Sequence, residues 1–175
     1  PRVLMLDEPA AGLNPQEKKD LQGLIDQKLT PAAFTDALEA ELKKGGTSLV
    51  VTETVTNPML DVIDLKKCCE LAHKYGAKII VDNTFATPIN CRPFEFGADI
   101  VIHSTTKYMD GHALQMGGVI VDGGHFNWAN GKFPDFSEPD KSYHGTVYTR
   151  DYPDCPYIIK ARMQLMRDFG CYPAA

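Results

Sequence analysis

An amine, a carboxylate and three hydroxyl groups each follow the end of a short, largely apolar run in this chain. Lys107 comes directly after Ser104-Thr105-Thr106, which closes the run of residues 98–102. Asp82 closes a second run, residues 78–82. Ligands of open α/β sheets bind outside the carboxyl ends of the strands, so we expect these groups to meet at one edge of a sheet. Taken singly, Asp82 is also typical of a turn or helix cap, and Lys107 of a solvated lysine.

Together these groups are the set that pyridoxal phosphate requires. The cofactor needs a lysine amine for its Schiff base, an acid that faces its pyridine nitrogen, and hydrogen-bond donors for its phosphate. Lys107 fits the first role and Asp82 the second. The hydroxyl groups of Ser104 and Thr106 can donate to the phosphate oxygens. The sequence therefore predicts a pyridoxal phosphate site in which Lys107 is the catalytic residue.

Alternating strand and helix patterns place these residues in an α/β fold. The predicted strands cover residues 3–7, 48–53, 78–83, 98–104 and 117–122, and the predicted helices cover residues 15–26, 31–44, 61–76 and 157–170. The strands are almost entirely apolar, which is typical of a mostly parallel sheet covered by helices on both faces. Residues 123–156 predict a long loop with short elements. In the last helix, Ile158, Ala161, Leu165 and Phe169 form one apolar stripe.

Composition argues against several kinds of partner. A net charge of −5 and an isoelectric point near 5.5 provide no basic surface for nucleic acid or an anionic membrane. No apolar run approaches the roughly 20 residues that span a bilayer, and the start of the chain lacks a signal-peptide pattern, so we expect a cytoplasmic protein. The five cysteines show no CxxC spacing, and His103 and His112 have no third ligand at metal spacing. We therefore predict neither a disulfide framework nor a metal site.

Several longer segments resemble a known family. ETVTNPMLDVIDL, IIVDNTFATP, GADIVIHSTTKYMDGHA and GGVIVDGGHFNW are similar to the Cys/Met-metabolism family of pyridoxal phosphate enzymes. The later GKFPDFSEPDKSYHGTVY and YIIKARMQLMRDFG resemble its O-acetylhomoserine sulfhydrylase branch. The resemblance covers about residues 49–170. It implies the central part of the large domain of a fold type I, aspartate aminotransferase-like enzyme.

The resemblance also implies roles for individual residues. Lys107 would form the Schiff base, Asp82 would pair with the pyridinium nitrogen, and Ser104 with Thr106 would hold the phosphate. Asn57, which follows Glu53 as in the family's acid-then-Asn-Pro stretch, would lie near the ring oxygen of the cofactor. Two residues depart from the pattern, since Asp110 and Ala113 stand where the family usually has glycine. An extra carboxylate three residues after the lysine could disfavour an anionic cofactor.

The implied reaction is a γ-replacement on O-acetylhomoserine by sulfide or a small thiol, which gives homocysteine or methionine. A γ-lyase of the methionine or cystathionine type is the alternative within the family. The family forms homotetramers with shared active sites, so a homo-oligomer that acts on a small amino acid substrate is implied. Family segments that complete the active site, among them the arginine for the substrate carboxylate, have no counterpart here, so an incomplete fragment is expected.

The first 27 residues resemble a different class of protein. PRVLMLDEPAAGLNPQEKKDLQGLID is similar to the Walker B strand and D-loop of an ABC-transporter ATPase of the branched-chain amino acid importer type, with Asp7 and Glu8 as its acids. No phosphate-binding GxxxxGK[ST] loop occurs in the chain, so ATP hydrolysis is not expected. We therefore expect a composite of an ATPase-like segment, residues 1–27, and a partial pyridoxal phosphate-binding domain, residues 28–175. A fragment of a transporter ATP-binding subunit and an inactive composite are the alternatives.

Overall fold

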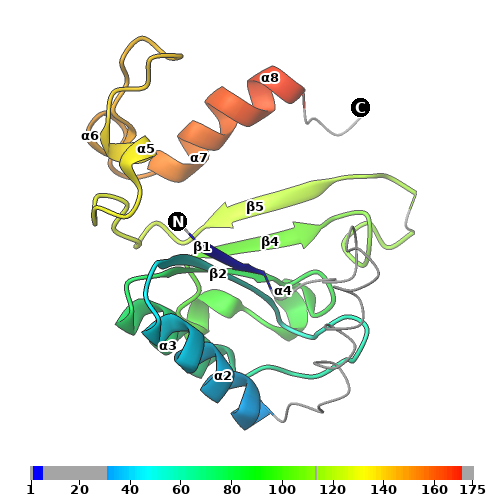
Figure 1. Cartoon of the computed structure of the whole chain (residues 1–175). Helices are drawn as coiled ribbons and strands as arrows, with labels where there is room; N and C mark the ends of the chain where they lie inside the picture. The colour runs from blue at the N-terminus through cyan, green and yellow to red at the C-terminus, as the bar shows by residue number, and fades with distance from the viewer. Residues whose placement is uncertain (1, 6–30, 113, 171–175) are drawn as a thin grey trace, which may run out of the picture.

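A five-stranded sheet forms the centre of the molecule (Figure 1). The computed structural model describes residues 2–5, 31–112 and 114–170. The strands lie side by side in chain order: β1 (Arg2–Met5), β2 (Thr47–Glu53), β3 (Lys78–Asp82), β4 (Ile100–Ser104) and β5 (Gly118–Asp122). The first four strands are parallel, and β5 runs antiparallel to β4. The prediction of a mostly parallel α/β sheet is confirmed.

The register of the sheet brings the predicted site residues to one edge. Glu53, the last residue of β2, is the partner of Asp82, the last residue of β3. Ser104 ends β4 and is the partner of Gly118 at the start of β5. Since β2, β3 and β4 are parallel, their last residues come together at the carboxyl edge of the sheet.

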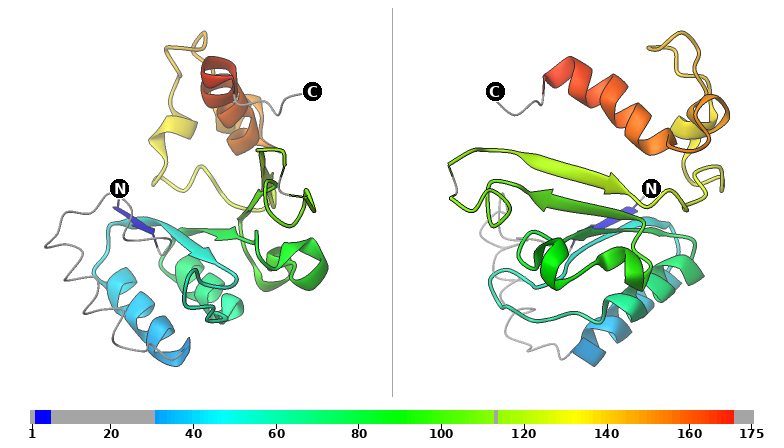
Figure 2. Two further views of the ribbon diagram at one scale, coloured as in Figure 1. Left: turned by 90° about the vertical axis from the view of Figure 1, so that its right-hand side faces the viewer. Right: turned by 180° about the vertical axis from the view of Figure 1, so that it is seen from behind.

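Two helices, α2 (Pro31–Lys43) and α3 (Leu65–Lys74), cover one face of the sheet (Figure 2). Leu38 and Leu42 of α2 pack with buried residues of α3 and of the strands in one hydrophobic cluster. The prediction that α3 begins near residue 61 is wrong. The Asp64 side chain accepts a hydrogen bond from the Lys67 N–H and caps the helix there, while Val62 forms a β-bridge with Val55.

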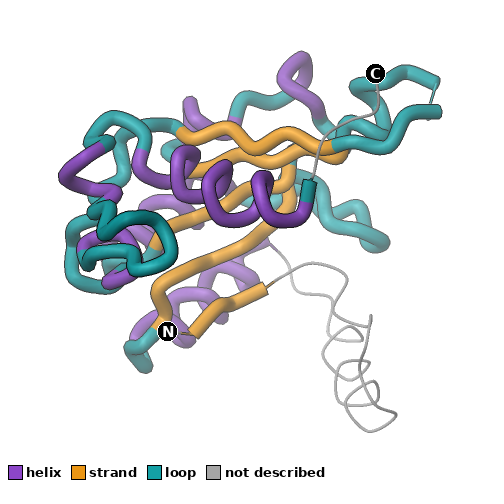
Figure 3. The backbone as a smooth tube through the Cα atoms, turned by 90° about the horizontal axis from the view of Figure 1, so that it is seen from above, coloured by secondary structure: helices purple, strands orange, loops and turns teal. Residues whose placement is uncertain are grey.

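The segment after β5 packs on the opposite face of the sheet, as the tube in Figure 3 shows from above. It contains the helical turns α5 (Pro134–Ser137) and α6 (Tyr148–Asp151), and then a continuous helix made of α7 (Pro156–Lys160), a π-helical stretch η2 (Ala161–Met166) and α8 (Arg167–Phe169). Trp128 and Tyr148 are buried beneath it against the sheet residue Ile100. Aromatic residues of the segment after β5 therefore pack onto the sheet.

The apolar stripe of the last helix does not face this core. Leu165 is 55% exposed and Phe169 is 76% exposed. The contacts with the second hydrophobic cluster come instead from Tyr157, Ile159 and Met163. The π-helical stretch accounts for part of the difference, because its wider turn changes the angle between successive side chains from that of an α-helix.

Strand β5 is more exposed than an apolar strand of a covered sheet would be. Val119, Ile120 and Val121 are 36%, 46% and 39% exposed. In the described part of the chain β5 pairs only with β4, so one of its edges carries no neighbouring strand. Helices Thr87–Asn90 (α4) and Pro93–Phe96 (η1) connect β3 to β4.

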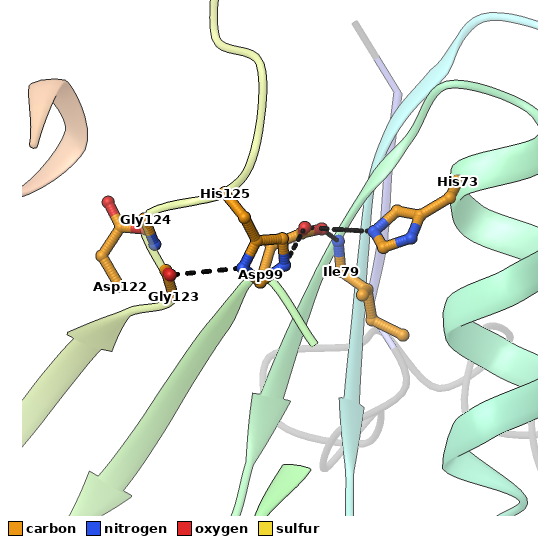
Figure 4. Close-up of polar contacts among 7 residues, drawn as sticks. All are labelled: His73, Ile79, Asp99, Asp122, Gly123, Gly124 and His125. Carbon is orange, nitrogen blue, oxygen red and sulfur yellow. Dashed lines mark hydrogen bonds and ion pairs between the residues drawn. The ribbon is translucent and has the colours of Figure 1, made fainter. Parts of the chain in front are cut away.

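A buried carboxylate at the amino edge of the sheet ties α3 to the strands (Figure 4). Asp99, just before β4, is 1% exposed and accepts a hydrogen bond of 2.8 Å from the Ile79 N–H. His73 Nε2 of α3 lies 3.0 Å from both of its oxygens, and His125 Nε2 lies 3.4 Å from Oδ1. The buried carboxylate is therefore surrounded by polar groups from α3, from β3 and from the loop after β5.

Strand β1 begins one residue before the predicted strand at residues 3–7 and overlaps it at residues 3–5. The predicted helix at residues 15–26 and the acids Asp7 and Glu8 lie outside the described residues. Within residues 2–5, 31–112 and 114–170, none of the helices combines the length and the apolar character that a bilayer crossing demands.

Candidate functional site

A cavity of about 640 Å³ opens at the carboxyl edge of the sheet. Its lining comes from the ends of β2, β3 and β4 and from the loops that follow them. The lining residues are Glu53, Asn57, Asp82, Thr84, Phe85, Ser104, Lys107, Tyr108, Gly111 and His112. Four of the five residues predicted for the cofactor site are therefore brought together, namely Asn57, Asp82, Ser104 and Lys107.

Asp82 is held in place by the residue two positions further along the chain. The Thr84 N–H and the Thr84 hydroxyl both donate to Asp82 Oδ1, at 2.9 and 2.5 Å. Neither of these bonds occupies Oδ2. The main-chain oxygen of Asp82 accepts hydrogen bonds from Thr54, from its N–H at 3.0 Å and from its hydroxyl at 3.2 Å. Both the backbone and the carboxylate of Asp82 are thus fixed in the cavity wall.

Lys107 lies in the turn that follows β4. Its N–H donates to the Ser104 carbonyl at 3.2 Å, and its side chain is exposed at the cavity. Thr106, the remaining predicted residue, is not among those that line the cavity. Its Oγ1 accepts a hydrogen bond from the Gly117 N–H at 3.0 Å and lies 3.3 Å from the Gly117 carbonyl oxygen, to which it donates. A phosphate-binding role for Thr106 stays a prediction.

The loop after β2 supplies a second carboxylate to the cavity. Glu53 is 8% exposed, and its Oε2 accepts a hydrogen bond of 2.7 Å from the Asn57 N–H. The Asn57-Pro58 peptide bond is cis. Because Glu53 and Asp82 are register partners on adjacent strands, two acids and the Lys107 amine share one cavity.

Four lining residues were not singled out from the sequence: Thr84, Phe85, Tyr108 and Gly111. Phe85 and Tyr108 contact each other with ring centroids 5.8 Å apart, which joins the loop after β3 to the loop after β4. Thr84 could have been found, because Asp-x-Thr is a common turn pattern in which the carboxylate accepts from the residue two positions on. The ring contact could not, since it depends on how two loops pack.

Asp110, the departure from the family's glycine, acts within its own loop. Its Oδ2 accepts a hydrogen bond of 2.9 Å from the Leu114 N–H. Asp110 is not one of the residues that line the cavity. Its carboxylate therefore stabilises the turn after the lysine, and the second departure, Ala113, lies outside the described residues.

Comparison with known proteins identifies the family. A family model described as "Cys/Met metabolism PLP-dependent enzyme" matches residues 17–142. The chain belongs to this family. The match of the Cys/Met-metabolism family begins inside the segment of residues 1–27 that resembles a transporter ATPase; the division at residue 27 stays a prediction.

Relatives in the Cys/Met-metabolism family agree with the resemblance seen in the sequence. Homocysteine/cysteine synthase of Saccharomyces cerevisiae is 46% identical over 127 residues, 71% of this chain and 29% of the yeast protein. O-acetyl-L-homoserine sulfhydrylase of Leptospira meyeri is 44% identical over 126 residues, 67% of this chain and 28% of that protein. The chain thus spans less than a third of the length of these relatives.

A solved structure shows the same fold. The crystal structure is that of a Campylobacter jejuni protein, assigned as an O-acetylhomoserine (thiol)-lyase. It contains N'-pyridoxyl-lysine-5'-monophosphate. It matches this chain with a TM-score of 0.67 and 32% identity, over 74% of this chain and 33% of its own. The α/β fold of this Cys/Met-metabolism family member is that of the fold type I pyridoxal phosphate enzymes.

The residues at the carboxyl edge fit the cofactor of the family. The cavity presents an amine on Lys107, a carboxylate on Asp82 and a hydroxyl on Ser104, the three kinds of group that pyridoxal phosphate needs. Asp82 is held by hydrogen bonds within the protein, from Thr84 to its carboxylate and from Thr54 to its main-chain oxygen. Asn57 adds a side-chain amide to the same lining.

Proposed function

We propose that this chain forms the cofactor-binding part of an enzyme that replaces the γ-acetoxy group of O-acetylhomoserine with sulfide or a small thiol. The products would be homocysteine or methionine. The observation that carries the proposal is the convergence of Lys107, Asp82 and Ser104 on one cavity at the carboxyl edge. The names of the relatives, homocysteine/cysteine synthase and O-acetyl-L-homoserine sulfhydrylase, support the choice of reaction.

The five residues predicted for the cofactor site each have a role in this proposal. Lys107 Nζ would hold the cofactor covalently, Asp82 would accept a hydrogen bond from its protonated pyridine nitrogen, and Asn57 would lie near its ring oxygen. Ser104 would donate a hydrogen bond to the phosphate, and Thr106 would do so by giving up its bond to the Gly117 carbonyl. When bound, pyridoxal phosphate supplies an electron sink for the charge that develops at the substrate α-carbon.

Lys107 also moves protons in this proposal. Its amine, when not bound to the cofactor, would act as a general base and remove the α-proton of the substrate. After releasing this proton, the same amine would remove a β-proton, and acetate would leave with the electron pair of its bond to the γ-carbon. The exposed position of the Lys107 side chain at the cavity leaves it room for these transfers.

The proposal is tested first at the cofactor. Pyridoxal phosphate is added to the purified chain and the visible spectrum is recorded before and after borohydride. We expect a visible band that borohydride removes, and a pyridoxyl group on the Lys107 peptide by mass spectrometry. Lys107→Ala should lack both, while Lys141→Ala, which removes an exposed lysine outside the cavity lining, should keep both. A folded chain without the band refutes the proposal.

The reaction is tested second. The chain with bound cofactor is given O-acetylhomoserine, with and without sulfide. Sulfide consumption matched by homocysteine formation supports γ-replacement. Release of acetate without sulfide consumption points to γ-elimination, the lyase alternative. The ATPase-related alternative predicts binding of a fluorescent ATP analogue, which the cofactor-binding proposal does not.

Assembly and location complete the proposal. We propose a homo-oligomer acting on a small amino acid substrate, as the family resemblance implies, and light scattering after size exclusion measures its mass. The cytoplasmic location stays a prediction.

A further inference from the structure

Thr84 connects the two strand ends that carry the proposed cofactor ligands. Its hydroxyl donates to Asp82 Oδ1 at 2.5 Å and accepts a hydrogen bond of 2.8 Å from the Ser104 N–H. Asp82 ends β3 and Ser104 ends β4. One hydroxyl group, through its single donor and one acceptor position, therefore links the carboxylate of one strand end to the backbone of the next.

The carboxylate of Asp82 depends on this link for its orientation. Thr54 fixes the backbone carbonyl of Asp82 but leaves its side-chain torsions free. Thr84 fixes the side chain, because its N–H and its hydroxyl both donate to the same oxygen. A carboxylate with one oxygen so anchored cannot rotate without breaking two hydrogen bonds, and the other oxygen keeps a constant direction in the cavity wall.

We infer that Thr84 is a positioning residue for the cofactor, which sets Asp82 for the pyridine nitrogen and Ser104 for the phosphate as one unit. The inference rests on the proposed function. It extends that function to a residue that lines the cavity and whose hydroxyl has both its hydrogen bonds within the protein. Thr84 therefore acts through its two neighbours rather than by holding the ligand itself.

The first test needs no cofactor. Hydrogen exchange of the Ser104 amide is measured by NMR in the wild type, Thr84→Val, Thr84→Ser and Thr149→Val. Thr149→Val is the matched control, because the Thr149 hydroxyl donates to the Phe136 carbonyl at 3.1 Å, away from the cavity. We expect Thr84→Val to speed exchange of Ser104 about tenfold, the effect of losing one hydrogen bond, and Thr84→Ser and the control to leave it unchanged.

The second test compares two ligands by spectral titration, pyridoxal phosphate and its 1-deaza analogue, in which C–H replaces the ring nitrogen. Thr84→Val should weaken binding of pyridoxal phosphate about tenfold, and Thr84→Ser should restore it. The ratio of the affinity for pyridoxal phosphate to the affinity for the analogue should fall at least threefold in Thr84→Val. This corresponds to about half of the free energy of one hydrogen bond. A merely structural role would weaken both ligands equally and leave this ratio unchanged.

The outcomes separate this inference from the proposed function. Unchanged Ser104 exchange in Thr84→Val, or an unchanged ligand ratio, overturns the role of Thr84 even if the wild type binds the cofactor. A wild type that binds neither ligand overturns the proposed function of the chain, and with it the positioning of a cofactor by Thr84. Faster exchange together with a reduced ratio supports both.

Discussion

Lys78 provides a stability test that is independent of the proposed activity. It is the first residue of β3 and is only 4% exposed. Its ammonium lies 3.6 Å from the centroid of the Trp128 ring and 5.0 Å from those of Phe133 and Tyr157. Burial lowers the pKa of Lys78 from 10.5 to about 8, and the nearby carboxylates of Asp99 and Asp122 oppose this shift.

The difference between a pKa of 10.5 and one of about 8 corresponds to roughly 3 kcal/mol of folding free energy. The sign follows from proton binding. Between pH 8 and 10.5 the unfolded chain binds the proton more tightly than the folded chain, so the stability contributed by Lys78 rises with pH across this window. Below about pH 8 the full penalty of the buried ammonium is present. Attraction of the ammonium to the ring faces makes roughly 3 kcal/mol an upper value.

The perturbation is Lys78→Met, which keeps most of the volume and removes the charge. Urea unfolding of both proteins is followed at several pH values from 7 to 10. We expect the stability of the wild type relative to Lys78→Met to rise with pH, by up to roughly 3 kcal/mol over the full window. Burial raises the pKa of Cys68 and Cys69 to about 12, which makes both proteins less stable above pH 9, but this effect cancels in the difference.

Lys67→Met is the control, since Lys67 is exposed on α3. Its stability difference from the wild type should not change with pH over the same range. A difference between the wild type and Lys78→Met that is equally flat would refute the reasoning, because it would mean that folding does not change the proton affinity of Lys78.

Three further predictions concern the core, the buried carboxylate and the thiols. Leu42→Ala, at a position 2% exposed, should lower the free energy of unfolding by about 2–5 kcal/mol in urea titrations, whereas Leu165→Ala, at 55% exposure, should change it by less than about 0.5 kcal/mol. Asp99→Asn should cost about 1.5–3 kcal/mol in the same assay, because the amide cannot reproduce the hydrogen bonds that the buried carboxylate accepts; an unchanged stability would contradict a structural role for the contacts drawn in Figure 4. Iodoacetamide at pH 8 should label half-buried Cys155 well before Cys68, which is fully buried, as peptide mass spectrometry can show; equal rates would contradict this.

The sequence was sufficient to predict the sheet and most of the site, for one physical reason. Parallel strands in an α/β fold end at the same edge, so polar residues that close apolar runs must meet there. Asp82, Ser104 and Lys107 follow from this rule, and all three line the cavity. Thr106 does not line the cavity, and its hydroxyl pairs with Gly117 instead. In a turn after a strand, the directions of successive side chains do not follow a simple period, so the sequence could not predict this.

Features that depend on contacts between distant segments could not be predicted in this way. A lysine that opens a strand is typical of a solvated position. Lys78 is buried only because aromatic residues from beyond β5 pack over it. The last helix shows the same limit, since the stripe that included Leu165 is apolar in sequence, but the docking of the helix is determined by Tyr157 and Met163.

The carboxyl edge and the amino edge of the sheet have different roles, so the stability test at Lys78 is independent of the cofactor tests. At the carboxyl edge, Thr84 and Lys107 line an open cavity where hydrogen bonds fix direction. At the amino edge, Asp99 and Lys78 are almost fully buried, and there compensation of charge determines stability. Lys78→Met should therefore change unfolding with little effect on cofactor affinity, whereas Thr84→Val should lower cofactor affinity and also cost about one hydrogen bond of stability. If Lys78→Met changed both quantities by similar factors, the strands between the edges would have to transmit the effect, and the roles assigned to the two edges would be wrong.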